Sequence, residues 1–365
     1  MRRLKTLLLV SLALIGLYLA AWPVPVEPVA WQAPRDRGLS GDFAANDALA
    51  GAGAVQLAAH EGPEDVAVGH DGALYATTAG GTVLRIDDDT HQVTEFAHPG
   101  GRPLGIEPAP DGSLLVANAY TGLQRISSLG AVTNLLTTVD GKPLVYANDL
   151  AVSGEGIIYF SVASVKFGAQ ASKGTYEASL LDILEHGGHG RVVAFDPRSG
   201  DTRIVIDGLN FANGIAVDDD GRFLLVAETG SYRILRHWLR GPDAGVTEVL
   251  LDNLPGFPDN INNGAAGRYW VGLVAPRDAK LDRLSDRPFL RKLVQRLPAF
   301  LRPAARPSSH VFAISADGEV LADLQDTAAR YPAMTGVCET GERLYITRLF
   351  GHELPYVDKA SLLLQ

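Results

Sequence analysis

Short apolar segments and turn residues alternate from about residue 54 to the end of the chain, and one such pattern returns six times. In each copy an apolar segment follows an anchor residue, a turn comes about seven residues after the anchor, and a second apolar segment follows. The six anchors are Glu64, Leu104, Asn148, Asn213, Asp259 and Thr335. Five of the turns contain glycine, which tolerates the positive φ of tight hairpins. These are Gly72, Gly112, Gly156, Gly221 and Gly267. The pattern predicts a repeated antiparallel β unit.

The spacing of the anchors indicates how these units are arranged. Successive anchors are 40, 44, 65, 46 and 76 residues apart, and the shorter spacings match four-stranded propeller blades. The last anchor leaves 30 residues, enough for three strands, and residues 54–58 can supply the missing fourth. Joining the two ends removes exposed sheet edges. An open sandwich would not require one turn phase six times, so we predict an all-β, six-bladed β-propeller over residues 54–365.

The two long spacings predict inserts at about residues 166–190 and 276–308. In the second insert, leucine, phenylalanine and valine recur at helical spacing with arginine and lysine between them. We therefore expect a helical insert with a basic amphipathic helix. Such a helix rests on an anionic membrane surface or packs as a lid across the propeller, and the sequence leaves both open.

The amino terminus precedes the propeller and has a different character. Arg2, Arg3 and Lys5 are followed by 17 uncharged residues from Thr6 to Trp22. We interpret residues 1–22 as an uncleaved signal anchor, because bulky Leu19 disfavours cleavage after the neighbouring alanines; a cleaved signal peptide is the alternative. Residues 23–53, rich in proline at their start, are expected to be an extended spacer. The propeller would then lie on the extracytoplasmic side (periplasmic, lumenal or extracellular), or be secreted.

Composition excludes several classes of function. The chain has 42 acidic and 32 basic side chains, a net charge of −10, which argues against nucleic acid as a partner. Its one cysteine, Cys338, excludes an intramolecular disulfide and a multi-thiolate metal site. Gly-x-Ser-x-Gly and phosphate-loop motifs do not occur, which disfavours a serine hydrolase or a nucleotide enzyme.

The anchors carry the candidate chemistry, because the residue that opens each innermost strand of a propeller faces the central channel. Four anchors are oxygen donors, namely Glu64, Asn148, Asn213 and Asp259. Oxygen ligands suit calcium, whereas zinc and copper prefer histidine or cysteine. Asn260 is a candidate fifth ligand or an orienting group. The alternative is that these groups hydrogen-bond buried water, but two carboxylates would repel each other without a cation. Leu104 and Thr335 face the same channel and are expected to line a substrate pocket.

Several motifs together resemble a known family. They are Arg102-Pro103-Leu104-Gly105-Ile106, Ala147-Asn148-Asp149-Leu150, Phe211-Ala212-Asn213-Gly214-Ile215-Ala216 and Gly256-Phe257-Pro258-Asp259-Asn260-Ile261. From about residue 50 onward, the chain resembles the strictosidine synthase-like proteins, a group that includes the adipocyte plasma membrane-associated proteins. This group is similar to the gluconolactonases, senescence marker protein and paraoxonases. The resemblance implies a six-bladed propeller that holds calcium at Glu64, Asn148, Asn213 and Asp259. It also implies that Asp259 attacks the substrate or activates water.

The chain departs from two relatives at the channel. Thr335 stands where plant strictosidine synthases have the glutamate of their condensation reaction, so alkaloid formation is not expected. Leu104 stands where paraoxonases have a catalytic histidine. The sequence thus predicts a membrane-anchored, calcium-dependent hydrolase of a small-molecule lactone or aryl ester, with Asp259 as the catalytic group. The alternative is a calcium-stabilised propeller that binds a ligand or a protein partner without catalysis.

Overall fold

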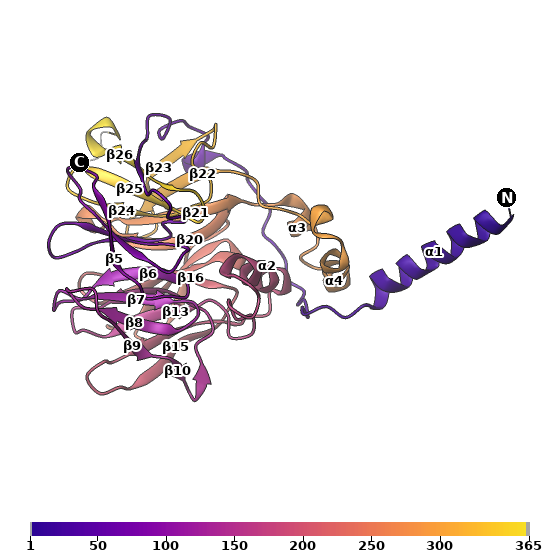
Figure 1. Cartoon of the computed structure of the whole chain (residues 1–365), viewed down its shortest axis with the longest axis horizontal. Helices are drawn as coiled ribbons and strands as arrows, with labels where there is room; N and C mark the ends of the chain where they lie inside the picture. The colour runs from indigo at the N-terminus through magenta and orange to yellow at the C-terminus, as the bar shows by residue number, and fades with distance from the viewer. Residues whose placement is uncertain (1, 363–365) are drawn as a thin grey trace.

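The computed structural model describes residues 2–362, which form a six-bladed β-propeller with an N-terminal helix (Figure 1). The innermost strands are β2 (Val66–Val68), β6 (Pro103–Pro108), β12 (Ala147–Val152), β16 (Ala212–Val217), β20 (Gly256–Asn263) and β24 (Met334–Glu339). The second strands are β3 (Leu74–Thr77), β7 (Leu114–Asn118), β13 (Ile158–Val162), β17 (Phe223–Glu228), β21 (Tyr269–Pro276) and β25 (Arg343–Arg348). Each innermost strand contacts the next around the ring, and β24 contacts β2. The predicted fold class is confirmed.

The outer half of each blade completes an antiparallel sheet of four strands. The third strands are β4 (Val83–Ile86), β8 (Gly122–Ile126), β14 (Gly190–Phe195), β18 (Arg233–Trp238), β22 (Ser309–Ile314) and β26 (Glu353–Asp358). The outermost strands are β5 (Val93–Ala97), β9 (Val132–Leu136), β15 (Thr202–Leu209), β19 (Thr247–Leu251), β23 (Val320–Asp326) and β1 (Gly53–Gln56). A small ribbon, β10 (Thr138–Val139) with β11 (Lys142–Pro143), lies between the second and third blades. The five turn glycines all have φ between 65° and 81°, which explains why glycine recurs there.

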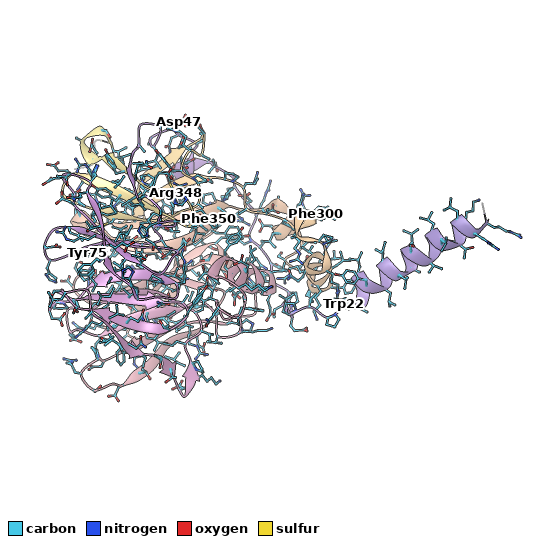
Figure 2. All side chains as sticks on the ribbon, in the orientation of Figure 1. Trp22, Asp47, Tyr75, Phe300, Arg348 and Phe350 are labelled. Atoms are coloured by element: carbon cyan, nitrogen blue, oxygen red, sulfur yellow. The ribbon has the colours of Figure 1, made fainter. Side chains whose placement is uncertain are left out.

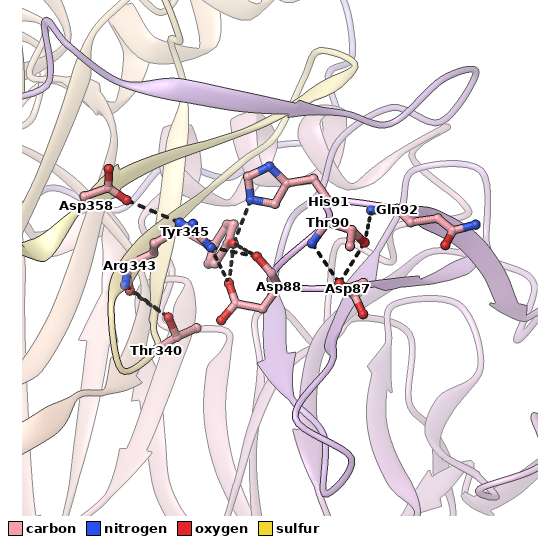
Figure 3. A network of polar contacts seen from close by, with 9 residues as sticks. All are labelled: Asp87, Asp88, Thr90, His91, Gln92, Thr340, Arg343, Tyr345 and Asp358. Carbon is pink, nitrogen blue, oxygen red and sulfur yellow. Dashed lines mark hydrogen bonds and ion pairs between the residues drawn. The ribbon is translucent and has the colours of Figure 1, made fainter.

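The ring closes by pairing its two ends. Strand β1 pairs with β26, with Val55 opposite Leu354, so residues before the first anchor complete the last blade as the length of the chain predicts. A polar network ties the first blade to the last at this junction (Figure 3). Asp88 accepts hydrogen bonds from the Tyr345 hydroxyl at 2.5 Å and from Arg343 at 3.3 Å. Closure therefore rests on strand pairing and on side-chain contacts between blades.

The two inserts are helical and lie on one side of the ring. The first contains α2 (Thr175–Glu185), and the second contains α3 (Ala279–Arg283) and α4 (Pro288–Arg296) (Figure 1). The predicted helical insert is present, but it is divided into two short helices. Pro288 begins α4, because proline is tolerated in a first helical turn and disfavours helix for the residue before it.

Residues 23–53, which we call the strap, were expected to be a spacer and instead pack along the propeller. Val26 is fully buried, and the Trp31 indole stacks on the His186 ring at 4.0 Å between centroids. The guanidinium groups of Arg277 and Arg291 donate hydrogen bonds to backbone carbonyls of the strap. The strap therefore belongs to the folded body, and a fragment that begins near residue 35 would lose part of it.

Helix α1 (Arg2–Ala21) precedes the strap and extends away from the propeller (Figure 1). An 18-residue window of this 20-residue helix has a mean hydropathy of 2.1, and it is the single helix within residues 2–362 that is long and apolar enough to span a membrane. A signal sequence has the same properties. The structure thus supports a signal or an anchor at this end.

Candidate metal centre

The anchor residues lie at irregular points of their strands, and this directs their side chains. In five innermost strands the register shifts across the anchor, between Pro103 and Ile106, Ala147 and Leu150, Ala212 and Ile215, Pro258 and Ile261, and Met334 and Val337. Such a bulge leaves backbone unpaired and turns a side chain away from the regular pleat. The repeated bulge explains how one sequence phase presents polar groups to the channel.

Hydrogen bonds join the predicted residues across the channel. The Asn213 amide donates to Asp259 Oδ1 at 2.5 Å and to Thr229 Oγ1 at 3.1 Å. The Asn260 amide donates to the Glu64 backbone carbonyl at 2.9 Å. The structure therefore brings residues of the first, fourth and fifth blades together, and Asn148 occupies the corresponding position on the third blade.

The two remaining anchors differ in their surroundings. The Thr335 hydroxyl donates to the Glu64 carbonyl at 2.7 Å and also bonds with the Thr347 hydroxyl. Leu104 packs in an apolar cluster with Tyr146 and Phe211. Thr335 is thus held by the ring itself, whereas Leu104 belongs to an apolar wall.

Four buried oxygens of this ring accept no hydrogen bond from the residues that the structure describes. They are Glu64 Oε2, Asn148 Oδ1, Asn213 Oδ1 and Asn260 Oδ1, and their residues are at most 3% exposed. Leaving a buried acceptor unpaired costs about 1–3 kcal/mol. All four atoms are hard oxygen donors, the type that calcium binds, so the residues fit a calcium ion. Within residues 2–362 no three His, Cys, Asp or Glu side chains assemble as a metal site, so a cation here would need amide oxygens as well as carboxylates.

Electrostatics also favour a cation. Burial raises the pKa of Glu64 well above its usual range, and the nearby Asp259 carboxylate raises it further. Burial likewise raises the pKa of Asp259 to about 7, although the hydrogen bond from Asn213 opposes this. Two carboxylates held together in a low-dielectric channel disfavour each other's charge. A bound divalent cation would stabilise both in their charged forms.

Beside the ring, two further carboxylates fasten neighbouring blades. Asp65 accepts a hydrogen bond from the Ile106 N–H at 2.9 Å, and Asp149 accepts one from the Ile215 N–H at 2.8 Å. Each bond joins one blade to the next. These carboxylates satisfy backbone groups, which gives them a structural role distinct from the unpaired oxygens.

Three polar residues near the ring and helix α2 were not assigned a role in the sequence analysis. Tyr146 donates to the Thr175 carbonyl of α2 at 2.8 Å, which holds this helix beside the ring. Arg102 and Asp182 are also buried. Arg102 begins the motif Arg102–Ile106, two residues before the anchor Leu104. The sequence therefore indicated where it lies, but not that it is buried. Asp182 lies on α2, and nothing in the local sequence indicates that this helix packs against the propeller.

Comparison with known proteins identifies the family. The strictosidine synthase profile matches residues 148–242, and the N-terminal profile of strictosidine synthase-like proteins matches residues 41–86. The adipocyte plasma membrane-associated protein of Bos taurus is 32% identical over 82% of this chain and 76% of its own length. The chain belongs to the strictosidine synthase-like family. Protein STRICTOSIDINE SYNTHASE-LIKE 6 of Arabidopsis thaliana is 31% identical, over 85% of this chain and 82% of its own.

Other members of the family extend beyond the matched region. STRICTOSIDINE SYNTHASE-LIKE 13 of Arabidopsis thaliana is 34% identical to this strictosidine synthase-like chain. The match covers 67% of this chain and 60% of that relative. The match to the Salmo salar adipocyte plasma membrane-associated protein also spans 60% of the relative.

Solved structures show the same fold at low sequence identity. A gluconolactonase from Xanthomonas campestris has a TM-score of 0.61 and 19% identity, over 85% of this chain and 90% of its own. A calcium-binding protein, regucalcin from Agrobacterium tumefaciens, has a TM-score of 0.54 and 14% identity, over 82% and 94%. The strictosidine synthase-like chain therefore has the gluconolactonase type of propeller.

Proposed function

We propose that this protein is a membrane-anchored, calcium-dependent hydrolase of lactones or aryl esters. The observation that carries the proposal is the set of four unpaired, buried oxygens beside Asp259. Glu64, Asn148, Asn213, Asp259 and Asn260 would hold the calcium ion. When bound, the ion would supply Lewis-acid polarisation of the ester carbonyl.

The chain's own groups divide the remaining work. Asp259 would attack the substrate or accept a proton from water, and its carboxylate is oriented by the short hydrogen bond from Asn213. The Asn148 side chain makes no hydrogen bond within the described part of the chain, so its amide N–H is available to a developing oxyanion. The apolar wall around Leu104 and Phe211 suits the aliphatic or aromatic part of an ester.

The first experiment uses the full-length chain in detergent, since the strap is part of the fold. Turnover of phenyl acetate and δ-valerolactone is measured for the wild type, Asp259→Ala and the exposed control Asp286→Asn, with EGTA and after calcium is restored. We expect calcium-dependent turnover in the wild type and the control, and a loss of at least about 100-fold in Asp259→Ala. Equal, chelator-insensitive turnover in all three proteins would refute the proposal.

The same samples separate hydrolysis from the non-catalytic alternative. A protein that only binds a ligand would lose thermal stability with EGTA and consume neither ester, because binding of calcium to the folded state alone stabilises it. Melting that is indifferent to EGTA would count against calcium in both cases.

The proposed membrane attachment is supported by the junction between α1 and α4. The Tyr18 hydroxyl donates to the Arg296 carbonyl at 3.1 Å, and the Arg296 guanidinium donates to the carbonyls of Leu19 and Trp22. Helix α4 thus caps the end of the apolar helix. If α1 spans the bilayer, α4 lies at the membrane surface.

Exposed aromatic side chains at this junction fit the same location. Trp22 is 60% exposed and Phe300 is 83% exposed, and Figure 2 shows both at the end of the molecule from which α1 extends. Tryptophan and basic residues are favoured at membrane interfaces. With Arg2, Arg3 and Lys5 on the cytoplasmic side, the propeller would be extracytoplasmic. The basic insert would then contact both the strap and the lipid surface.

A further inference from the structure

Arg102 is a buried cation whose guanidinium has no partner among the described residues. The residue is 7% exposed, and its guanidinium makes no hydrogen bond or ion pair within residues 2–362, with Nη1 fully enclosed. The buried Arg277 and Arg291 differ, because both donate to backbone carbonyls. A buried arginine is ordinarily paired, since desolvating its charge is costly. The missing partner of Arg102 is therefore expected to come from outside the chain.

The backbone of Arg102 is fixed beside the metal centre. Its N–H donates to Asn118 Oδ1 at 3.2 Å, and its carbonyl accepts from the Ala119 N–H at 2.9 Å. Burial lowers the pKa of Arg102, and the Glu64 carboxylate opposes that effect. Burial raises the pKa of Glu64 and of Tyr146, and the positive charge of Arg102 opposes that rise. The guanidinium thus lies within electrostatic reach of the ring without contacting it.

Binding of a cation changes the charge balance around Arg102. Glu64 is the buried carboxylate that offsets its charge, and Glu61 is exposed. A divalent ion bound by Glu64 would neutralise the negative charge of that carboxylate. The positive charge of the Arg102 guanidinium would then have no buried carboxylate to offset it. A monoanion beside the ion would restore the balance. The planar fork of a guanidinium matches the two oxygens of a carboxylate.

We propose that Arg102 binds a carboxylate of the substrate or product beside the metal centre. The inference rests on the proposed function. Hydrolysis breaks the acyl C–O bond and forms a new bond to the water oxygen; the alcohol leaves with one proton, a second proton is released, and a carboxylate remains. The anion therefore has two possible sources, a carboxylate already present on the substrate or the one that hydrolysis creates. The neighbouring Leu104 and Tyr146 would contact its apolar portion.

Binding tests this assignment without turnover. Calorimetry and thermal shift would measure the binding of valerate and 5-hydroxyvalerate to wild type, Arg102→Gln, Arg102→Lys and the control Arg125→Gln, all with calcium; the Arg125 side chain is partly exposed and pairs with Asp111. We expect at least tenfold weaker carboxylate binding in Arg102→Gln, partial recovery in Arg102→Lys and no change in the control. Equal binding by wild type and Arg102→Gln, or no binding of either probe to wild type, would overturn the proposal.

Kinetics identify the source of the carboxylate. If the substrate carries it, wild type should have a lower KM for 4-nitrophenyl hydrogen glutarate than for 4-nitrophenyl valerate, and Arg102→Gln should abolish that difference. If hydrolysis creates it, Arg102→Gln should instead relieve inhibition by 5-hydroxyvalerate and leave the two KM values as they were. Either result supports the role of Arg102 and assigns the anion.

Stability separates a binding role from a structural one. Arg102→Met removes an unpaired buried charge at similar volume, so the ligand-free variant should melt at the same temperature as the wild type or higher. A clearly lower melting temperature would show that Arg102 supports the fold and would contradict the proposal. Carboxylate binding to the wild type is measured independently of turnover, so failure of the hydrolase proposal and failure of the Arg102 proposal give different results.

Discussion

Gly214 allows the geometry of the ring to be tested by a single methyl group. A Cβ at this position would lie 2.3 Å from the Ile261 nitrogen, 2.5 Å from the Asn260 carbonyl carbon and 2.5 Å from the Asp259 oxygen. All three are backbone atoms, which cannot rotate away as a side chain would. Gly214 has no positive φ, so the expected cost of Gly214→Ala is steric overlap alone.

The magnitude follows from overpacking a close contact. Such substitutions cost about 1–3 kcal/mol, and a backbone neighbour places this one near 3 kcal/mol. At about 2 cal/mol/K of unfolding entropy per residue, a propeller of roughly 310 residues would melt about 4–5 °C lower. Because the overlap displaces the strand that carries Asp259 and Asn260, calcium affinity should also fall.

The assay is a urea or thermal melt with and without calcium, followed by a calcium titration. Gly154→Ala is the matched control, because a Cβ there meets no atom within 4 Å and its φ is ordinary. Gly154→Ala should change neither property. If Gly214→Ala had the stability and calcium affinity of Gly154→Ala, the close approach of β16 to β20 would be wrong.

Two further predictions concern Asp182 of helix α2 and the N-terminal helix α1. Burial raises the pKa of Asp182 to about 6, so its contribution to stability is present below about pH 4 and is lost as pH rises through 6. Asp182→Asn should therefore raise the urea midpoint at pH 7.5 but hardly at pH 4; an equal gain at both values would contradict this assignment. The full-length chain should remain in membranes after carbonate extraction and a chain lacking residues 2–21 should not, whereas release of the full-length chain would argue against an anchor.

The six-fold repeat could be predicted from the sequence because each blade is specified by residues close together in the chain. Alternating apolar residues, a turn of fixed phase and glycine at positive φ all depend on residues within one blade. Closure was also predictable, since the chain after Thr335 is one strand short and residues 54–58 supply it. The bulges that direct the anchors toward the channel were not visible, because a bulge is defined by the register of a partner strand.

The polar anchors of the candidate site could be found because they occupy the same position in each repeat. Their hydrogen bonding could not be predicted from the sequence. Whether Asn148 Oδ1 or Asn213 Oδ1 has a hydrogen-bond partner depends on residues from other blades. Sequence alone also gave no account of Arg102, although it recognised the motif that contains this residue. Whether its guanidinium has a partner among the described residues depends on side chains from several blades and from the inserts.

What the sequence determined by itself was the blade, its repetition and the residue types offered to the axis, because each follows from spacing of a few tens of residues. Only the tertiary structure decided what covers that axis. The strap is held by Arg291, more than 250 residues from the Val29 carbonyl to which it donates. Helix α2 is likewise held by Tyr146 through a backbone carbonyl. Such contacts have no local pattern, because a carbonyl is present at every residue and the fold alone selects which one meets the donor.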